Sequence, residues 1–368
     1  MTRRRLARLL AAVAVLAVVG GGGWFAFNRL SQTGQKPAPS PEPTIGGTTF
    51  DVTHYGASGN GSKDSSGAIQ AAIDAAQVAG GGRVYFPPGD YLIGSKPDVI
   101  APGSPVEIEG SGRDTTTLTS ASGVRVLLVQ ADHSIVSGLT FDAHTHGGGP
   151  ALVVPASYVT VEHCRILGAV GGSWPLRFAG GHATASPLHP SYATGNTVDD
   201  LILHDYAPGR NDGFDFSFQQ NASISNVQHI GSRLGLYVDR FVSVTNYSYT
   251  PEPTLTGGTY GYFITDPGYH ITITNFTTSG QGGKIGVIPT GNPRAASSDI
   301  TITGEKMTGG SAFQLFIGDV TNMVIENSVL GRVVVAPTDM TQCTIVKSAY
   351  AALSKQPSPG ATVTVTIG

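Results

Sequence analysis

Acidic and aromatic residues alternate in the segment GFDFSF, residues 213–218, and one turn of chain later the segment LGLYVD, residues 234–239, repeats the pattern. Successive side chains of a β-strand point to opposite faces, so the three phenylalanines are predicted to point inward and Asp215 and Ser217 outward. The same alternation predicts that Tyr237 and Asp239 point outward. Carboxylates and a phenol on one surface can exchange protons with a bound substrate.

Basic and aromatic side chains surround these positions if the strands stack on one another. Arg177 is predicted to point outward from the preceding strand, and the segment from residue 173 to 196 is long enough to fold over the patch. A guanidinium group binds a carboxylate with two parallel hydrogen bonds, and aromatic faces stack on pyranose rings. The candidate catalytic residues are Asp212, Asp215, Arg233 and Tyr237, and the candidate substrate-binding residues are Arg177, Ser217, Asp239, Arg240, Tyr260, Lys284, Trp174 and His182.

Six of these residues also have a purely structural interpretation. Asp212 and Asp215 could hydrogen-bond to turn amides. Arg233 and Asp239 could form an ordinary surface ion pair, and Tyr237 and Tyr260 could serve only in packing. No metal site is predicted with certainty. Calcium remains an option because the three aspartates could cluster on this patch.

A recurring pair of residues predicts the scaffold that would hold this patch. A Val or Ile is followed two positions later by Gly, Asn or His, at intervals that are mostly 20–29 residues. Gly, Asn and His are residues that adopt a left-handed backbone most readily, as a sharp turn between two strands requires. Asn in successive turns could stack in a hydrogen-bonded ladder. The pairs are Val136/Gly138, Val161/His163, Ile202/His204, Ile224/Asn226, Val244/Asn246, Ile273/Asn275, Ile302/Gly304, Ile325/Asn327 and the weaker Ile345/Lys347.

These intervals match the length of one turn of a parallel β-helix. A β-sandwich with Asn turns is the rival fold, but it would not keep so constant an offset. The interval from His163 to His204 is 41 residues, which predicts a loop at residues 173–196. Cys164 and Cys343 would lie several rungs apart, too far for a disulfide, so both are expected to be reduced and buried.

The segment from residue 50 to 93 closes one end of this predicted helix. Ser65 or Ser66 can cap an α-helix from about residue 67 to 79, and Ile69, Ile73 and Ala76 form its apolar stripe. Such a helix would cover the open edge of the first rung. The segment resembles the N-terminal region of the pectate lyase superfamily, on the motifs Tyr55-Gly56-Ala57, Ala68-Ile69-Gln70-Ala71-Ala72-Ile73 and Val84-Tyr85-Phe86-Pro87-Pro88-Gly89.

The resemblance implies a right-handed parallel β-helix and a substrate lying along one of its sheets. Asn211-Asp212-Gly213-Phe214-Asp215 is similar to motifs of polygalacturonases and mannuronan epimerases, but it departs from both. The polygalacturonase acid pair of the next rung is replaced by Arg233-Leu234, and the Tyr and His of the epimerase motif are replaced by Asp212 and Ser217. A hydrolysis mechanism that uses two carboxyl groups would therefore lack the second of them.

The N-terminus predicts export from the cytoplasm. Residues 1–31 combine four arginines with an apolar run long enough to span a bilayer, and a cleaved signal peptide is the alternative. Residues 32–47 form a Pro-rich spacer, and residues 48–368 form the β-helix domain. Residues 1–44 carry six basic side chains and one acidic one, so the body is more acidic than the net charge of −3 suggests. Nucleic acid is therefore not an expected partner.

The prediction is an all-β, single-stranded right-handed parallel β-helix with an N-terminal capping helix, preceded by a transmembrane anchor. We expect a carbohydrate-active enzyme that acts on an extracellular, uronate-containing polysaccharide, as a lyase or C5-epimerase ahead of a glycoside hydrolase. The alternative is a non-catalytic glycan-binding or structural protein of the cell surface, anchored to the membrane or secreted if the segment is cleaved. Monomer and homotrimer both remain open.

Overall fold

The computed structural model describes residues 45, 47–94, 103–121, 125–144, 150–168, 174–178, 192–206, 212–231, 234–251, 260–287, 296–308 and 314–368. The expected anchor at residues 1–31 and nearly all of the spacer lie outside this part of the chain. Within the described residues, no helix is long and apolar enough to cross a membrane. The compact unit that contains them runs from Pro43 to Gly368.

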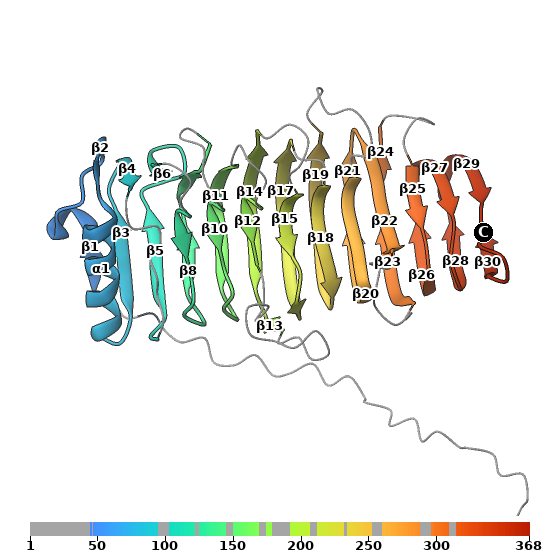
Figure 1. Ribbon diagram of the computed structural model, residues 1–368, viewed down its shortest axis with the longest axis horizontal. Helices are drawn as coiled ribbons and strands as arrows, with labels where there is room; N and C mark the ends of the chain where they lie inside the picture. The colour runs from blue at the N-terminus through green and yellow to red at the C-terminus, as the bar shows by residue number, and fades with distance from the viewer. Residues whose placement is uncertain are drawn as a thin grey trace, which may run out of the picture. The chain divides into compact units, whose positions relative to one another are not determined.

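Every strand pair among the described residues is parallel, and most strands pair with one about one turn of chain earlier and one about one turn later, which confirms a parallel β-helix (Figure 1). The strands fall into three columns. The first column, which carries the recurring Val and Ile residues, contains β1 (Thr49–Asp51), β3 (Gly82–Phe86), β5 (Val106–Gly110), β8 (Ile135–Ser137), β11 (Thr160–Gly168), β14 (Thr197–Asp205), β17 (Ala222–Ile230), β19 (Val242–Thr250), the end of β20 (Tyr260–Thr274), β23 (Ser297–Thr303), β26 (Val320–Glu326), β28 (Met340–Val346) and β30 (Thr362–Ile367).

The other two columns complete each rung. The second contains β2 (Asn60–Asp64), β4 (Gly89–Ile93), β6 (Thr116–Ser120) and β9 (Thr140–Asp142), the ends of the long strands β11 to β19, then β21 (Thr277–Thr278), β24 (Lys306–Met307) and the starts of β27 (Val329–Val335) and β29 (Ala349–Lys355). The third contains β7 (Leu127–Leu128), β10 (Leu152–Val153), β12 (Leu176–Arg177), β15 (Asp212–Phe216), β18 (Leu234–Arg240), the start of β20, β22 (Gln281–Val287) and β25 (Gln314–Ile317). A separate pair joins β13 (Ala193–Thr194) to β16 (Gln219–Gln220).

The first end of the stack is covered as the sequence predicts. A short 3-10 helix, η1 (Val52–Tyr55), precedes α1 (Ser66–Val78), which packs on β1 and β3 (Figure 1). Ile69, Ile73 and Ala76 are buried, so the predicted stripe faces the first rung. The side-chain cap comes from Asp64 rather than a serine, because its Oδ1 accepts a hydrogen bond from the Ser66 amide at 2.9 Å.

The left-handed turn column is confirmed at eight of its nine predicted positions. The inward Val and Ile residues are 0–1% exposed, and strand register aligns them from Val136 to Ile345. Asn246 Nδ2 donates to Asn226 Oδ1 at 3.0 Å, and Asn275 Nδ2 donates to Asn246 Oδ1 at 3.1 Å, which forms the expected ladder.

The prediction for Ile202/His204 is wrong. Val198 pairs with Val161 and Ile224, and Asp200 takes the left-handed position with φ 47°. His204 lies further along β14, where it pairs with Leu167 and Ile230. The same two-residue spacing occurs twice in this strand, and only the neighbouring rungs decide which copy forms the turn.

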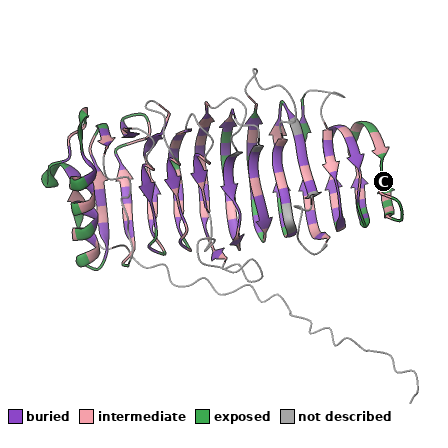
Figure 2. Ribbon diagram, viewed as in Figure 1, coloured by how far each residue is buried: buried purple, intermediate pink, exposed green. Residues whose placement is uncertain are grey.

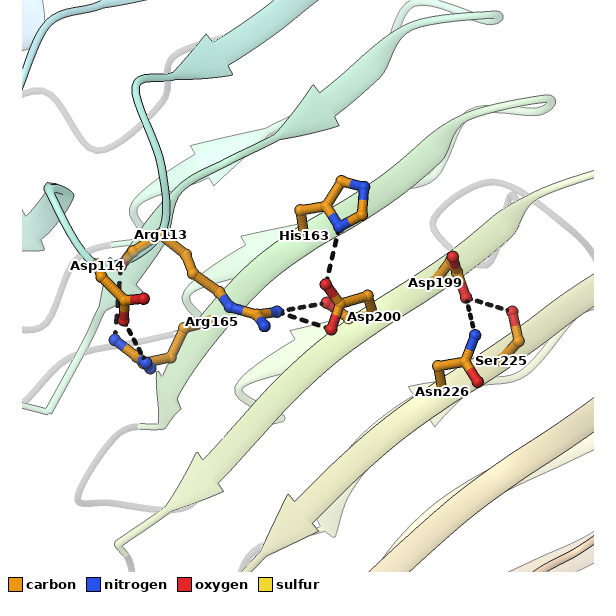
Figure 3. A network of polar contacts seen from close by, with 8 residues as sticks. All are labelled: Arg113, Asp114, His163, Arg165, Asp199, Asp200, Ser225 and Asn226. Carbon is orange, nitrogen blue, oxygen red and sulfur yellow. Dashed lines mark hydrogen bonds and ion pairs between the residues drawn. The ribbon is translucent and has the colours of Figure 1, made fainter.

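Asp200 is held by residues of earlier rungs (Figure 3). Arg113 Nη1 donates to its Oδ1 at 2.9 Å, and His163 Nδ1 lies 2.8 Å from its Oδ2. The hydrogen bond with Asp200 raises the pKa of His163, and in turn lowers the pKa of Asp200. Hydrogen bonds to neighbouring rungs therefore hold the Asp200 carboxylate at this turn, as they hold the asparagine amides at later turns.

A continuous apolar core fills the inside of the rungs, while polar and half-buried residues alternate with it on the outside (Figure 2). Cys164 and Cys343 are free and buried, as expected, and burial raises the pKa of each thiol to about 12. Phe214 and Phe216 are fully buried, but Phe218 is not.

Candidate active site

One row of outward side chains runs along the third column of strands. Register pairs each member with the next through β12, β15, β18, β20, β22 and β25. Adjacent parallel strands lie about 4.8 Å apart, so the row spans six rungs in a line. We call this row the stripe; its members, in order, are Arg177, Asp215, Tyr237, Phe263, Lys284 and Phe316.

An ion pair occupies the first two rungs of the stripe. Arg177 Nε donates to Asp215 Oδ2 at 3.0 Å, while the Ser217 amide and hydroxyl both donate to Asp215 Oδ1, at 3.1 and 2.5 Å. Asp215 is 3% exposed and the Arg177 side chain 36%. Burial raises the pKa of Asp215, and its bonds with Ser217 and Arg177 oppose that rise. Asp215 therefore fixes the orientation of Arg177, whose partly exposed guanidinium faces solvent.

Tyr237 occupies the next rung, beside two aromatic rings. The ring of Trp174 meets it edge-on, with centroids 5.8 Å apart. The ring of Phe263 lies parallel to it at 6.2 Å. These contacts hold a half-buried phenol on the surface of the sheet, next to Arg177 and Asp215 in the row.

Lys284 lies among three aromatic rings further along the stripe. Its Nζ is 5.4 Å from the ring centroids of Tyr260 and Phe316 and 5.7 Å from that of Phe263. Cation–π attraction of this kind holds an ammonium group without a carboxylate partner. Lys284 makes no salt bridge to another described residue, so its charge remains available to an acidic ligand.

Asp239 does not lie where the alternation predicts. It is 2% exposed, and its Oδ2 accepts a hydrogen bond from the Phe218 amide at 2.8 Å. The register between β18 and β20 shifts between Val238 and Arg240, the two residues that flank Asp239, so the pairing is irregular at this position. Burial raises the pKa of Asp239 to about 7, which nearby backbone amides and Arg240 partly offset. A sugar on the stripe cannot contact this carboxylate directly in the observed conformation.

Other predicted residues lie beside the stripe or outside the described chain. Arg240 lies between two aromatic rings, with its guanidinium carbon 4.7 Å from the Tyr192 centroid and 5.2 Å from that of Tyr269. Ser217 is buried against Asp215 rather than exposed. The side chain of Asp212, together with Arg233 and His182, lies outside the described part of the chain.

The donor groups do not fit a calcium site. Both oxygens of Asp215 already accept hydrogen bonds, and Asp239 Oδ2 accepts one from the Phe218 amide. Over the described ranges, no group of three or more His, Cys, Asp or Glu residues could hold a metal ion.

Two members of the stripe, Phe263 and Phe316, were not among the predicted site residues. Neither side chain carries a charge or a titrating group, and the predicted aromatic residues Trp174 and Tyr260 lie outside the row. Counting one turn on from Tyr237 along YGYFIT would have placed Phe263 in the row, because Tyr262 and Ile264 beside it are the buried residues of that strand.

Comparisons with known proteins agree with the fold. Residues 49–151 match the family model of rhamnogalacturonase A and epimerase, pectate lyase-like. An alginate lyase of Azotobacter vinelandii is 33% identical over 212 residues, which are 49% of this chain and 23% of the relative. An exopolygalacturonase of Zea mays is 31% identical over 132 residues, 33% of this chain and 30% of the relative.

Among solved structures, the A-module of an Azotobacter vinelandii mannuronan C5-epimerase superposes with a TM-score of 0.59 at 16% identity, covering 87% of this chain and 97% of the module. At that identity the match supports the fold alone. The chain spans from 4% to 30% of the length of the curated relatives it matches. Together these matches confirm the resemblance to the pectate lyase superfamily, whose matched members include epimerases, lyases and hydrolases that modify polysaccharides.

Proposed function

We propose that this protein modifies an acidic, uronate-containing polysaccharide bound along the stripe, by β-elimination or by C5 epimerisation. The observation that carries the proposal is the position of Tyr237, directly between the Arg177–Asp215 pair and the aromatic rings that surround Lys284. Two partly exposed cations separated by a proton-transfer group and aromatic surface suit a chain of acidic pyranoses.

The chemistry begins with the acidity of the C5 proton of a uronate. Arg177 binds the uronate carboxylate and stabilises the negative charge that develops there when a base removes this proton. Asp215 holds the guanidinium in position and is not itself a base, because its oxygens are occupied by Arg177 and Ser217. Tyr237, acting as a phenolate, accepts the C5 proton. Delivery of a solvent proton to C5 from the other face gives the epimer, and Tyr237 returns its proton to water. Transfer of the proton from Tyr237 to the departing glycosidic oxygen instead breaks the bond at C4 and gives an unsaturated end.

Hydrolysis has less support from the geometry. It needs two carboxyl groups facing the scissile bond. Asp215 and Asp239 are both nearly fully buried and engaged in other hydrogen bonds. The same burial favours a second candidate function, a module that binds the polysaccharide without changing it.

Substitution of Tyr237 separates these two functions. Tyr237→Phe keeps the ring contacts with Trp174 and Phe263 and removes only the hydroxyl. An enzyme would lose turnover by about 10²-fold or more with affinity little changed, because proton transfer contributes about that factor. Tyr260→Phe is the matched control, since its ring contacts Lys284 and it is given no proton-transfer role. Activity equal to that of the wild type in both variants would contradict the assignment of proton transfer to Tyr237.

We also propose that residues 1–31 anchor the protein and place this body outside the cytoplasmic membrane, where such polysaccharides occur. Treatment of intact cells with a protease tests this proposal. Protease added outside the cells should cleave the β-helix domain, residues 48–368. Survival of this domain in intact cells would contradict the proposal.

A further inference from the structure

A second column of left-handed residues runs along another edge of the β-helix. Its members lie three positions before the inward Val or Ile of each rung and have φ between 45° and 72°. Most are Gly, Asn, Asp or His, which tolerate this conformation best. The column consists of His133, Tyr158, Gly195, Asn221, Phe241, His270, Asp299 and Asn322.

Tyr158 and Phe241 are the exceptions in this column. A bulky side chain in the left-handed region is an outlier that costs conformational energy. Both residues are also exposed, at 42% and 41%, so burial offsets only part of that cost. Backbone preference would favour asparagine at these positions. An exposed ring kept at a strained position indicates a role for the ring itself.

The two rings lie on either side of Asn221. Tyr158 stacks on His133 with ring centroids 4.7 Å apart, and it leans over Gly195, where a Cβ atom would lie 2.5 Å from its Cδ1. Phe241 stacks on His270 at 4.8 Å. Backbone hydrogen bonds join Gly195 to Gln220, and Ala222 to Phe241, so the rung of Asn221 lies between those of Gly195 and Phe241.

Asn221 supplies a polar group between the rings. It is exposed, and its side chain makes no hydrogen bond to another described residue. From Tyr158 to Phe241 is three rungs, or about 14 Å. Arg240 precedes Phe241 in the chain and adds a cation held between Tyr192 and Tyr269.

We propose that Tyr158, Asn221 and Phe241 form a second, non-catalytic binding site for a polysaccharide chain. The ring faces stack on pyranose units, and the Asn221 amide hydrogen-bonds a sugar hydroxyl between them. The site lies at the turn edge, apart from the stripe, and would hold a long chain while the stripe acts on another part of it. The inference takes only the chemical class of its ligand from the proposed function.

Substitution by the residue that the column itself prefers gives a clean test. Tyr158→Asn, Phe241→Asn and the double variant keep a side chain suited to the left-handed turn, so thermal stability should be unchanged or higher. Tyr55→Asn is the control, because Tyr55 is similarly exposed but lies in η1 outside the column. Migration of each full-length protein is measured in native gels that contain polymannuronate, polygalacturonate or neutral xylan.

The wild type and Tyr55→Asn should be retarded by at least one of the acidic polymers, and the double variant should bind it about tenfold more weakly, about 1.4 kcal/mol. Turnover of a short oligosaccharide, which reaches only the stripe, should be unchanged. Equal retardation of the double variant and the wild type, or no retardation of the wild type in any gel, overturns the inference. A retarded wild type that yields no product contradicts the proposed function and leaves this site standing.

Discussion

Arg177 and Asp215 face each other across adjacent rungs, with the guanidinium Nε 3.0 Å from Oδ2 of a carboxylate that is almost completely buried. The pair joins two features of the site. It satisfies a carboxylate that burial would otherwise neutralise, and it points a cation outward at the start of the stripe. The same contact therefore contributes to both folding and substrate recognition.

Replacing Arg177 by Gln should affect stability and turnover together. Removing one partner of a fully buried pair costs about 3–5 kcal/mol. Because Arg177 is 36% exposed, we expect a smaller loss, about 1–3 kcal/mol, in urea unfolding, with turnover reduced at least about tenfold. Arg83→Gln is the control: its partner Glu109 is more exposed, so the loss should be at most about 1 kcal/mol. Equal stability of the two variants would contradict a special role for the buried pair.

Replacing Lys284 by Met should weaken binding of acidic polymers without disturbing the fold. Methionine fills the space among Tyr260, Phe263 and Phe316 but carries no charge. We expect KM to rise about tenfold at low salt and to depend less on salt than in the wild type, because one screened attraction has been removed. Lys306→Met, on an exposed lysine of β24, should change neither quantity. Unchanged KM and unchanged salt dependence in Lys284→Met would contradict a role for Lys284 in binding acidic polymers.

Glu305 makes stability depend on pH. It is completely buried inside the rungs, where Tyr262 donates a hydrogen bond to its Oε2 at 3.0 Å, and burial raises its pKa from 4.5 to about 7. The folded state thus holds a proton that the unfolded state has lost. Its contribution to stability is present below about pH 4.5 and disappears as the pH rises through about 7.

Glu305→Gln should remove this dependence. Glutamine can still accept the Tyr262 hydrogen bond and never ionises, so the variant should match the wild type near pH 4 and exceed it at pH 8 by up to about 3 kcal/mol. Glu326→Gln is the control, because Glu326 is only half-buried and accepts from Thr303. Urea unfolding at the two pH values measures the difference. Parallel stability curves for Glu305→Gln and the wild type would contradict the assignment.

The fold could be predicted from the sequence because one physical requirement recurs. Each rung must turn sharply at one place, and asparagine or glycine at a constant distance from an inward Val or Ile marks that place. Asp200 escaped the pattern because two hydrogen-bonding partners, Arg113 and His163, make an aspartate acceptable there. The second turn column was missed because Tyr158 and Phe241 interrupt its series of Gly, Asn, Asp and His residues.

The site was predictable only where the strands are regular. Alternation placed Arg177, Asp215 and Tyr237 in one row, as the register confirms. It failed at Asp239, because the register of β18 shifts between Val238 and Arg240 and the Asp239 carboxylate accepts a hydrogen bond from the Phe218 amide of the preceding rung. Burial of Asp215 could not be foreseen, since it depends on contacts with Ser217 and Arg177 across rungs.

The most direct test of the central claim is to incubate the purified protein with polymannuronate and polygalacturonate in heavy water and to analyse the polymers by mass spectrometry. We predict either deuterium at C5 without cleavage, which indicates epimerisation, or unsaturated ends, which indicate elimination. In each case Tyr237→Phe should abolish the product. Saturated fragments, or polymers recovered intact and unlabelled, would contradict this prediction.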